Sequence, residues 1–145
     1  MVLGTLTLTR LVGTRLTAAT GAVLTPKQFA RFLARDGGCL HCGETEAVAP
    51  NHRANRGMGG SKTRDVPSNI VVLCSVYNGL IESNAAAAKE SQFYGWKLES
   101  WQDPLTEPVY DTQKDEWICL DNDFGRIVVA RPVRESNDSR NPNRV

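Results

Sequence analysis

The sequence predicts an α+β fold, with helices and antiparallel strands in separate stretches of the chain. Three observations indicate it: a helix with clear boundary signals near residues 25–36, a β-branched apolar run at residues 70–74, and two apolar segments, 117–120 and 126–130, that flank turn residues. The chain has 145 residues, of which 41% are hydrophobic and 23% are charged. These values are typical of one ordinary globular domain.

The first helix has the strongest local signals. Thr25 is a suitable N-cap, Pro26 fits the first helical position, and Gln28 completes a capping box. Gly37 and Gly38 end the helix. Its apolar side chains recur at helical spacing and predict a face packed on the core; they are Phe29, Phe32 and Leu33. We expect this helix to act as a buttress for the segment that follows.

Shorter patterns predict the remaining elements. A turn at residues 67–69 leads into a strand at 70–74, an Ala-rich stretch predicts a helix from about residue 78 to 94, and residues 96–101 favour a strand. The two apolar segments near the C-terminus predict a β-hairpin with a somewhat long loop.

Composition divides the chain into four parts. Residues 1–24 form a Thr-rich extended segment without an evident role, and residues 25–101 hold the buttressing helix and the chemically informative motifs. Residues 102–131 comprise an acidic segment and the hairpin, and the polar residues 132–145 predict a disordered tail. No apolar run approaches the ~18 residues of a membrane span, and the N-terminus lacks signal-peptide features. We expect a cytoplasmic protein without membrane contact.

Charge is distributed unevenly along the chain. Residues 1–64 hold nine Lys and Arg against three Asp and Glu, whereas residues 103–123 hold one against seven. A basic half attracts phosphate and an acidic segment repels it, so this pattern favours a nucleic-acid face with an acidic face opposite. Chance scatter of charges on a small domain is the alternative.

Four cysteines without secretory context favour ligands or buried thiols over disulfides. Cys39 and Cys42 form a C-x-x-C, a spacing that allows two thiolates to hold one tetrahedral zinc. A redox pair or two unrelated thiols would have the same spacing. Cys74 is a third candidate ligand, whereas Cys119 lies in an apolar strand, where a buried thiol is the default.

His52 opens a basic, glycine-rich stretch with no acidic residue between Glu46 and Asp65. Such a stretch can bring backbone amides and cationic side chains close to phosphate oxygens, although a solvated basic loop has the same composition. The predicted DNA-backbone contacts are Arg53, Arg56, Lys62 and Arg64.

The ordered set of motifs resembles a known family. The stretch CLHCGETEAVAPNHRANRGMGGSKTRDVPSNIVVLCSVYNGLIES is similar to the HNH endonuclease domain, especially the small proteins of this type in actinobacterial phages. The histidine-arginine pair, RGMGGS, PSN and LC carry the resemblance. It covers residues 36–101 and the C-terminal hairpin loosely, so residues 25–101 would form an HNH nuclease domain with its buttressing helix.

The resemblance implies a ββα-metal core in which two strands joined by a loop pack on a helix and hold one catalytic divalent metal. His52 matches the general base that removes a proton from water, a role suited to an imidazole. Asn69 matches an architectural asparagine, whose amide can bridge backbone groups of the loop and so fix the direction of the His52 ring. Asn78 matches the final position and would offer an oxygen to Mg²⁺ or Mn²⁺.

Two departures from the family pattern affect the metal sites. Asn51 stands where a strong metal ligand is common, so Glu82, one turn after Asn78, could supply the missing charge or could simply be exposed. The zinc that many of these domains carry would have Cys39, Cys42 and Cys74 as ligands, with Tyr77 where a fourth cysteine is expected. Either His41 or Cys119 is recruited, or the zinc site has decayed.

These features predict a metal-dependent endonuclease that cleaves or nicks DNA phosphodiesters. The alternative is a degenerate HNH-fold module that binds DNA without cleaving it. A zinc-stabilised protein-interaction domain would leave the basic loop without a purpose. DNA is the expected partner, a phage packaging terminase is a candidate partner, and the host cytoplasm is the expected location if a phage encodes the chain.

Overall fold

The computed structural model describes residues 24–55 and 64–133. The predicted α+β class is confirmed. The elements in chain order are α2 (Pro26–Asp36), β1 (Val48–His52), the 3-10 turn η2 (Pro67–Asn69), β2 (Ile70–Cys74), α3 (Ser75–Ser83), α4 (Ala85–Phe93), β3 (Val109–Asp111), β4 (Glu116–Leu120) and β5 (Arg126–Val129). The predicted N-terminal extended segment, up to residue 23, and the predicted tail from residue 134 lie outside the described residues.

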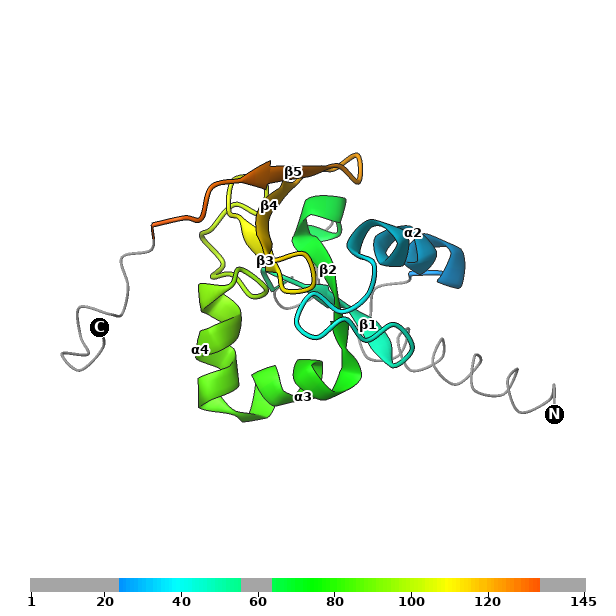
Figure 1. Ribbon diagram of the computed structural model, residues 1–145. Coiled ribbons are helices and arrows are strands. Elements are labelled where there is room, and N and C mark those ends of the chain that lie inside the picture. Colours follow the sequence, from blue (N-terminus) through cyan, green and yellow to red (C-terminus); the bar gives the residue numbers. More distant parts are fainter. Residues whose placement is uncertain (1–23, 56–63, 134–145) are drawn as a thin grey trace.

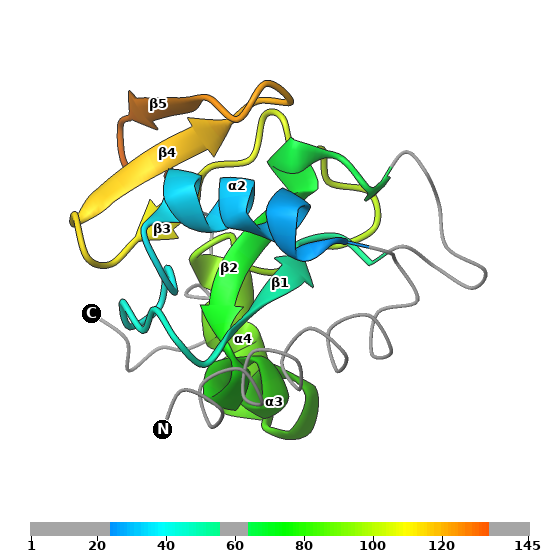
Figure 2. The same ribbon diagram turned by 90° about the vertical axis from the view of Figure 1, so that its right-hand side faces the viewer.

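The strands form two small antiparallel sheets. Strands β1 and β2 pair with His52 opposite Ile70 and Val48 opposite Cys74, and the second sheet has the order β3-β4-β5. The β1–β2 pair lies at the centre of the molecule, with α3 and α4 on one side of it and the second sheet on the other (Figure 1). After a 90° turn, α2 lies in front of β2 (Figure 2).

Helix α2 begins and ends as the sequence predicts. The capping box between Thr25 and Gln28 is present, and Gly37 ends the helix at φ 76°, a left-handed conformation that glycine adopts without strain. Its last residues, Arg35 and Asp36, form a buried ion pair at 2.6 Å. This pair docks the helix on the outer edge of β2, because an Asp36 oxygen accepts the Val72 N–H and the Arg35 guanidinium donates to the carbonyl of Ile70.

Two predictions about the secondary structure were wrong, and one strand was missed. The helix expected at residues 78–94 is two helices, because the backbone of Asn84 leaves the helical region and its side chain caps α4. Residues 96–101 form no strand and contribute an isolated bridge between Ala54 and Leu98. Strand β3 was not predicted, since its three residues are too few to show an alternating pattern.

The C-terminal hairpin is confirmed, and its turn supports the segment before β2. The hairpin's Asn122 side chain accepts a hydrogen bond from the Ser68 N–H at 3.0 Å. The Phe124 ring packs against Phe32 of α2, with ring centroids 4.9 Å apart. The hairpin therefore covers the end of the first sheet that carries His52.

Arg53 is a core residue, so its prediction as a DNA contact was wrong. Its side chain is fully buried. The guanidinium donates to backbone carbonyls of three separate segments, namely Gly95, Ser68, and the stretch 104–108 with Pro104, Glu107 and Pro108. An arginine whose donors are all directed at buried carbonyls cannot also reach phosphate. Sequence composition counts this charge as surface charge, although it holds the fold together.

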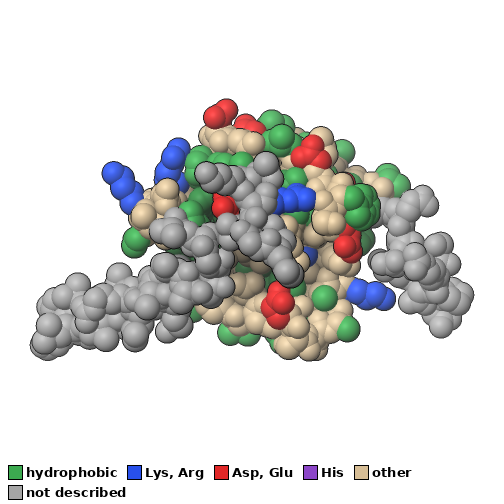
Figure 3. Space-filling model, turned by 180° about the vertical axis from the view of Figure 1, so that it is seen from behind, with side chains coloured by type: hydrophobic (Ala, Val, Ile, Leu, Met, Phe, Trp, Pro, Cys, Tyr) green, Lys and Arg blue, Asp and Glu red, His purple; other side chains and the backbone are tan. Residues whose placement is uncertain are grey.

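Figure 3 shows one face of the molecule on which Lys and Arg side chains stand apart, separated by hydrophobic and acidic side chains. No single basic patch is visible on the described part of this face. In the acidic segment, Asp111 is buried and paired with Arg126 at 2.9 Å. At least one carboxylate of the acidic segment is therefore buried in an ion pair and does not contribute to a charged surface.

No helix in residues 24–55 and 64–133 is both long and apolar enough to cross a membrane.

Replacement of Arg53 by Met should strongly destabilise the protein. The change leaves several buried carbonyls without donors, so we expect the free energy of unfolding in urea to fall by about 3 kcal/mol or more. The exposed Arg131 provides a control, and Arg131→Met should change stability by less than about 0.5 kcal/mol. Equal stability of the two variants would contradict the structural role of Arg53.

Candidate functional site

Two clusters of chemically active side chains lie at opposite ends of β2. Cys74 is the last residue of β2, and its thiol lies close to those of Cys39 and Cys42. Asn69 immediately precedes β2 and lies beside the segment after His52. We describe these as the thiol cluster and the loop clamp, respectively.

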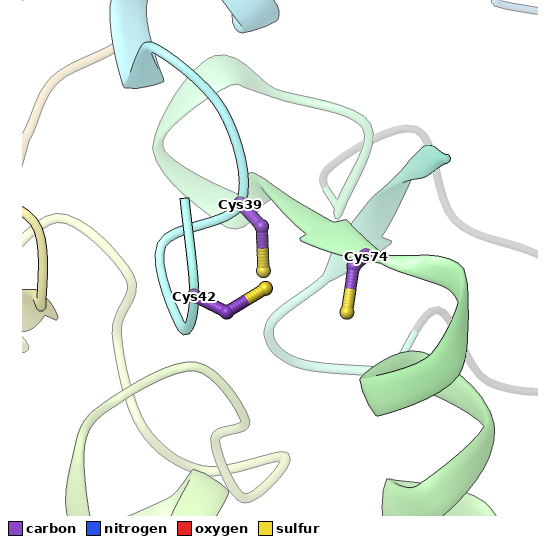
Figure 4. A group of neighbouring side chains, drawn as sticks. All are labelled: Cys39, Cys42 and Cys74. Carbon is purple, nitrogen blue, oxygen red and sulfur yellow. The ribbon is translucent and has the colours of Figure 1, made fainter. Parts of the chain in front are cut away.

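The thiol cluster consists of Cys39, Cys42 and Cys74. All three sulfur atoms lie within 4.8 Å of one another and point toward a common centre (Figure 4). Tetrahedral zinc with bonds of ~2.3 Å to sulfur places thiolates roughly 3.8 Å apart, so modest side-chain shifts would close the site. It is the only such group of three or more His, Cys, Asp or Glu donors in the described part of the chain.

Backbone N–H groups already point at two of these sulfurs. The His41 N–H donates to Cys39 Sγ, and the Tyr77 N–H donates to Cys74 Sγ, each at 3.3 Å. Gly43 has φ 84°, and a Cβ there would lie 2.6 Å from the Gln113 side chain, so the turn needs glycine. Burial raises the pKa of Cys39 to about 12, so an ion must displace its proton. A zinc ion would fit this donor set and would tie the turn to the start of α3.

Neither His41 nor Cys119 joins the thiol cluster as a fourth ligand, and Tyr77 occupies the position where a fourth cysteine is expected. The Tyr77 hydroxyl donates to a Glu90 carboxylate oxygen at 2.7 Å, and burial together with that carboxylate raises the pKa of Tyr77. The His41 ring stacks on Tyr77 with centroids 3.8 Å apart and lies outside the donor group. Cys119 lies in β4 and is also outside it. Three protein thiols are therefore the whole set among the described residues.

The loop clamp has the geometry predicted for Asn69. This side chain is fully buried. Its oxygen accepts the Ala54 N–H at 2.8 Å, and its amide nitrogen donates to the carbonyls of Ala54 and Arg64 at 3.0 and 2.9 Å. One amide thus joins both ends of the loop between Ala54 and Arg64.

His52 is the last residue of β1, and its ring forms a hydrogen bond with the Asp65 carboxylate that the sequence does not predict. The distance between His52 Nε2 and Asp65 Oδ1 is 2.8 Å, and the His52 side chain is 11% exposed. Asp65 directly follows Arg64, one of the two clamped residues. With Nε2 bonded to a carboxylate, Nδ1 is the atom that would accept a proton from water.

The residues expected to hold Mg²⁺ or Mn²⁺ do not make a tight site by themselves. Asn51 is buried, and its amide donates to the Trp96 carbonyl at 3.0 Å. Successive side chains of a strand alternate between its faces, so Asn51 and His52 point to opposite faces of β1. Asn78 is half-buried, and the exposed Glu82 lies one turn further along α3. One carboxylate and two amides hold such an ion weakly.

Lys97 is a second residue that sequence reasoning missed. Its ammonium donates to the His52 carbonyl and to the Asn55 side-chain oxygen, each at 3.2 Å. Burial lowers the pKa of Lys97, and the nearby Glu82 carboxylate raises it. A lone lysine between apolar residues gives no sequence signal of such a contact.

The predicted DNA contacts give three different outcomes. Arg64 is half-buried, and its guanidinium donates to the Ser100 carbonyl, next to Trp101. Arg56 and Lys62 lie outside the described residues. Arg53 is excluded by its burial.

The chain matches no protein-family model, no curated protein and no solved structure.

Replacement of Cys74 by Ser should abolish zinc binding while keeping helix α3. Serine is a good N-cap, so it can replace Cys74 Sγ as the acceptor of the Tyr77 N–H, but it cannot supply a thiolate. We expect bound zinc, measured after dialysis by mass spectrometry of the metal, to fall from one equivalent to almost none. Cys119→Ser should bind zinc as the unchanged chain does. Full zinc retention in the Cys74 variant would exclude the thiol cluster as its site.

Replacement of Asn69 by Asp should open the loop clamp. The carboxylate keeps an acceptor but loses both N–H donors and faces the carbonyls of Ala54 and Arg64. We expect the free energy of unfolding to fall by about 3 kcal/mol in urea titrations. At the exposed Asn122, whose oxygen is an acceptor, Asn→Asp should cost less than about 1 kcal/mol. Similar losses at both positions would contradict the clamp.

Proposed function

We propose that the chain is an endonuclease of the HNH type, in which His52 activates a water molecule that attacks a DNA phosphodiester. The observation that carries this proposal is the pair of contacts that fix His52 at the end of β1. Its ring is bonded to Asp65, and the Asn69 amide holds the loop that separates the two residues. A general base needs this kind of orientation before it can remove a proton efficiently.

The order of elements also supports the proposal. Strand β1, the loop, β2 and α3 follow one another directly, as a ββα-metal core requires. The base lies at the end of β1, and the asparagine that holds the loop precedes β2. This order agrees with the family resemblance in the sequence from Cys39 to Ser83.

In the proposed reaction His52 Nδ1 takes a proton from water, the water oxygen attacks phosphorus, and the bond from phosphorus to the leaving oxygen breaks. Asp65 stabilises the imidazolium that forms. A bound Mg²⁺ or Mn²⁺ would supply charge stabilisation at the leaving oxygen, with Asn78 and Glu82 as its expected ligands, because the Asn51 side chain is bonded to the Trp96 carbonyl and points to the opposite face of β1 from His52. Because that donor set is weak, the phosphate of DNA would have to complete it.

DNA is the proposed partner. Of the four DNA contacts predicted from the sequence, the half-buried Arg64 is the described one that can still reach phosphate, and the neighbouring Trp101 is 79% exposed. The other two tryptophans, Trp96 and Trp117, are 1% and 7% exposed. Tryptophan emission should therefore report on DNA bound near residue 101. A terminase partner and a location in the host cytoplasm stay predictions.

A DNA-binding module without cleavage is the second candidate function. It is favoured by the orientation of Asn51, whose buried amide is bonded to the Trp96 carbonyl. This candidate predicts salt-sensitive DNA binding without strand cleavage. Calorimetric titration with Mn²⁺, with and without DNA, separates the two, because a module that has lost its metal gives no heat in either condition.

Replacement of His52 by Ala should remove the activity. In a plasmid-nicking assay with Mg²⁺ or Mn²⁺, we expect the rate to fall by about 10² to 10⁴ while DNA binding is retained. His41→Phe is the matched control, because the chain has two histidines and phenylalanine can keep the stacking on Tyr77. Nicking that survives in the His52 variant would reject this residue as the base.

A further inference from the structure

Residues 96–98 run beside residues 51–54, where β1 ends. Lys97 therefore lies next to the end of this strand. The Leu98 N–H donates to the Arg53 carbonyl at 2.7 Å, and the Asn51 side chain donates to the Trp96 carbonyl on the other side of Lys97. These bonds hold the backbone on both sides of Lys97. Its side chain therefore starts from a fixed position next to His52.

Among the residues that the structure describes, the ammonium of Lys97 contacts only uncharged oxygens at hydrogen-bond distance. Its two acceptors are the backbone carbonyl of His52 and the side-chain oxygen of Asn55. An ammonium carries three donors, so these contacts leave one N–H. Lys97 also forms no ion pair with a described carboxylate. Its positive charge is thus hydrogen-bonded to neutral groups, one of which is the backbone carbonyl of His52.

The carboxylate that acts electrostatically on the Lys97 ammonium is that of Glu82 on α3. The carboxylate of Glu82 acts on the ammonium through space and not through a direct contact. Glu82 is also the one anionic ligand expected for a divalent ion. A lysine and a divalent ion near the same carboxylate repel each other, so Lys97 disfavours binding of the ion in the free protein.

We propose that Lys97 is the resident phosphate-binding cation of this site and holds a backbone phosphate oxygen of DNA beside His52. The inference rests on the proposed function, since it assigns a substrate contact in the same site. Phosphate adds the negative charge that the surroundings of Lys97 lack, and an ammonium is a suitable point charge for phosphate. Lys97 also takes over part of the role that a tightly held divalent ion has in a carboxylate-rich site.

The test compares Lys97→Met with Lys97→Arg and with Lys89→Met. Methionine keeps the apolar stem and removes the charge, arginine keeps the charge, and Lys89 is an exposed lysine on α4. DNA binding is measured with EDTA present, by tryptophan emission at several salt concentrations. We expect Lys97→Met to weaken binding about three- to tenfold and to reduce the salt slope by about 0.9, the value for one phosphate contact. The other two variants should bind within about twofold of the unchanged chain.

A second measurement is the Mn²⁺ affinity, which we expect to rise in Lys97→Met while the DNA affinity falls. Without DNA, Lys97→Met should bind Mn²⁺ about three- to tenfold more tightly than the unchanged chain, because the repelling charge near Glu82 is gone. Glu82→Gln in the same chain should abolish that gain. A fold damaged by the substitution would lower both affinities, so the pair of results distinguishes charge from structure.

The outcomes separate the inference from the proposed function. Unchanged DNA affinity and salt slope in Lys97→Met, with DNA binding by the unchanged chain, would overturn the role of Lys97 alone. Unchanged or weaker Mn²⁺ binding in that variant would also overturn it. An unchanged chain that binds no DNA would overturn the proposed function together with the phosphate contact.

Discussion

The buried guanidinium of Arg53 is the contact on which the arrangement of the candidate site depends. It follows His52 directly and donates to carbonyls in the turn before β2, in the segment after α4 and in the stretch that leads to β3. These segments are far apart in sequence, and the described sheets do not pair them with one another. A single planar group with several fixed donors satisfies their carbonyls together, which a lysine could not do. The position of His52 is therefore set by the residue after it.

The sequence predicted those parts of the fold that have local signals. The cap at Thr25, the turn before Ile70 and the C-terminal hairpin each depend on residues within a few positions of one another, and all three are present. The break at Asn84 was missed because a run of alanines favours one continuous helix. Strand β3 depends on pairing with β4, a contact that its three residues do not encode alone.

The residues of the candidate site also divide into those with a local sequence signal and those that only the fold brings together. The thiol cluster and the Asn69 clamp were predicted because cysteine spacing and a motif position indicated them. Asp65 and Lys97 meet His52 only through the fold, and neither has a neighbouring sequence signal. For Arg53 the prediction was wrong because a count of charges cannot distinguish an arginine in solvent from one enclosed by carbonyls.

Strand β2 connects the two clusters mechanically. Cys74 ends the strand and Asn69 precedes it, so at ~3.3 Å per residue they lie roughly 16 Å apart. An ion in the thiol cluster is too far from His52 to act on its chemistry directly. It would act by fixing Cys74 at the junction with α3, and hence the direction of the helix that carries Glu82. Because β2 is buried along its whole length, its side chains are closely packed. A displacement of one end of the strand is therefore transmitted to the other end. A metal ion bound by the thiol cluster would thus influence where Asn78 and Glu82, the oxygen ligands of the proposed second site, stand.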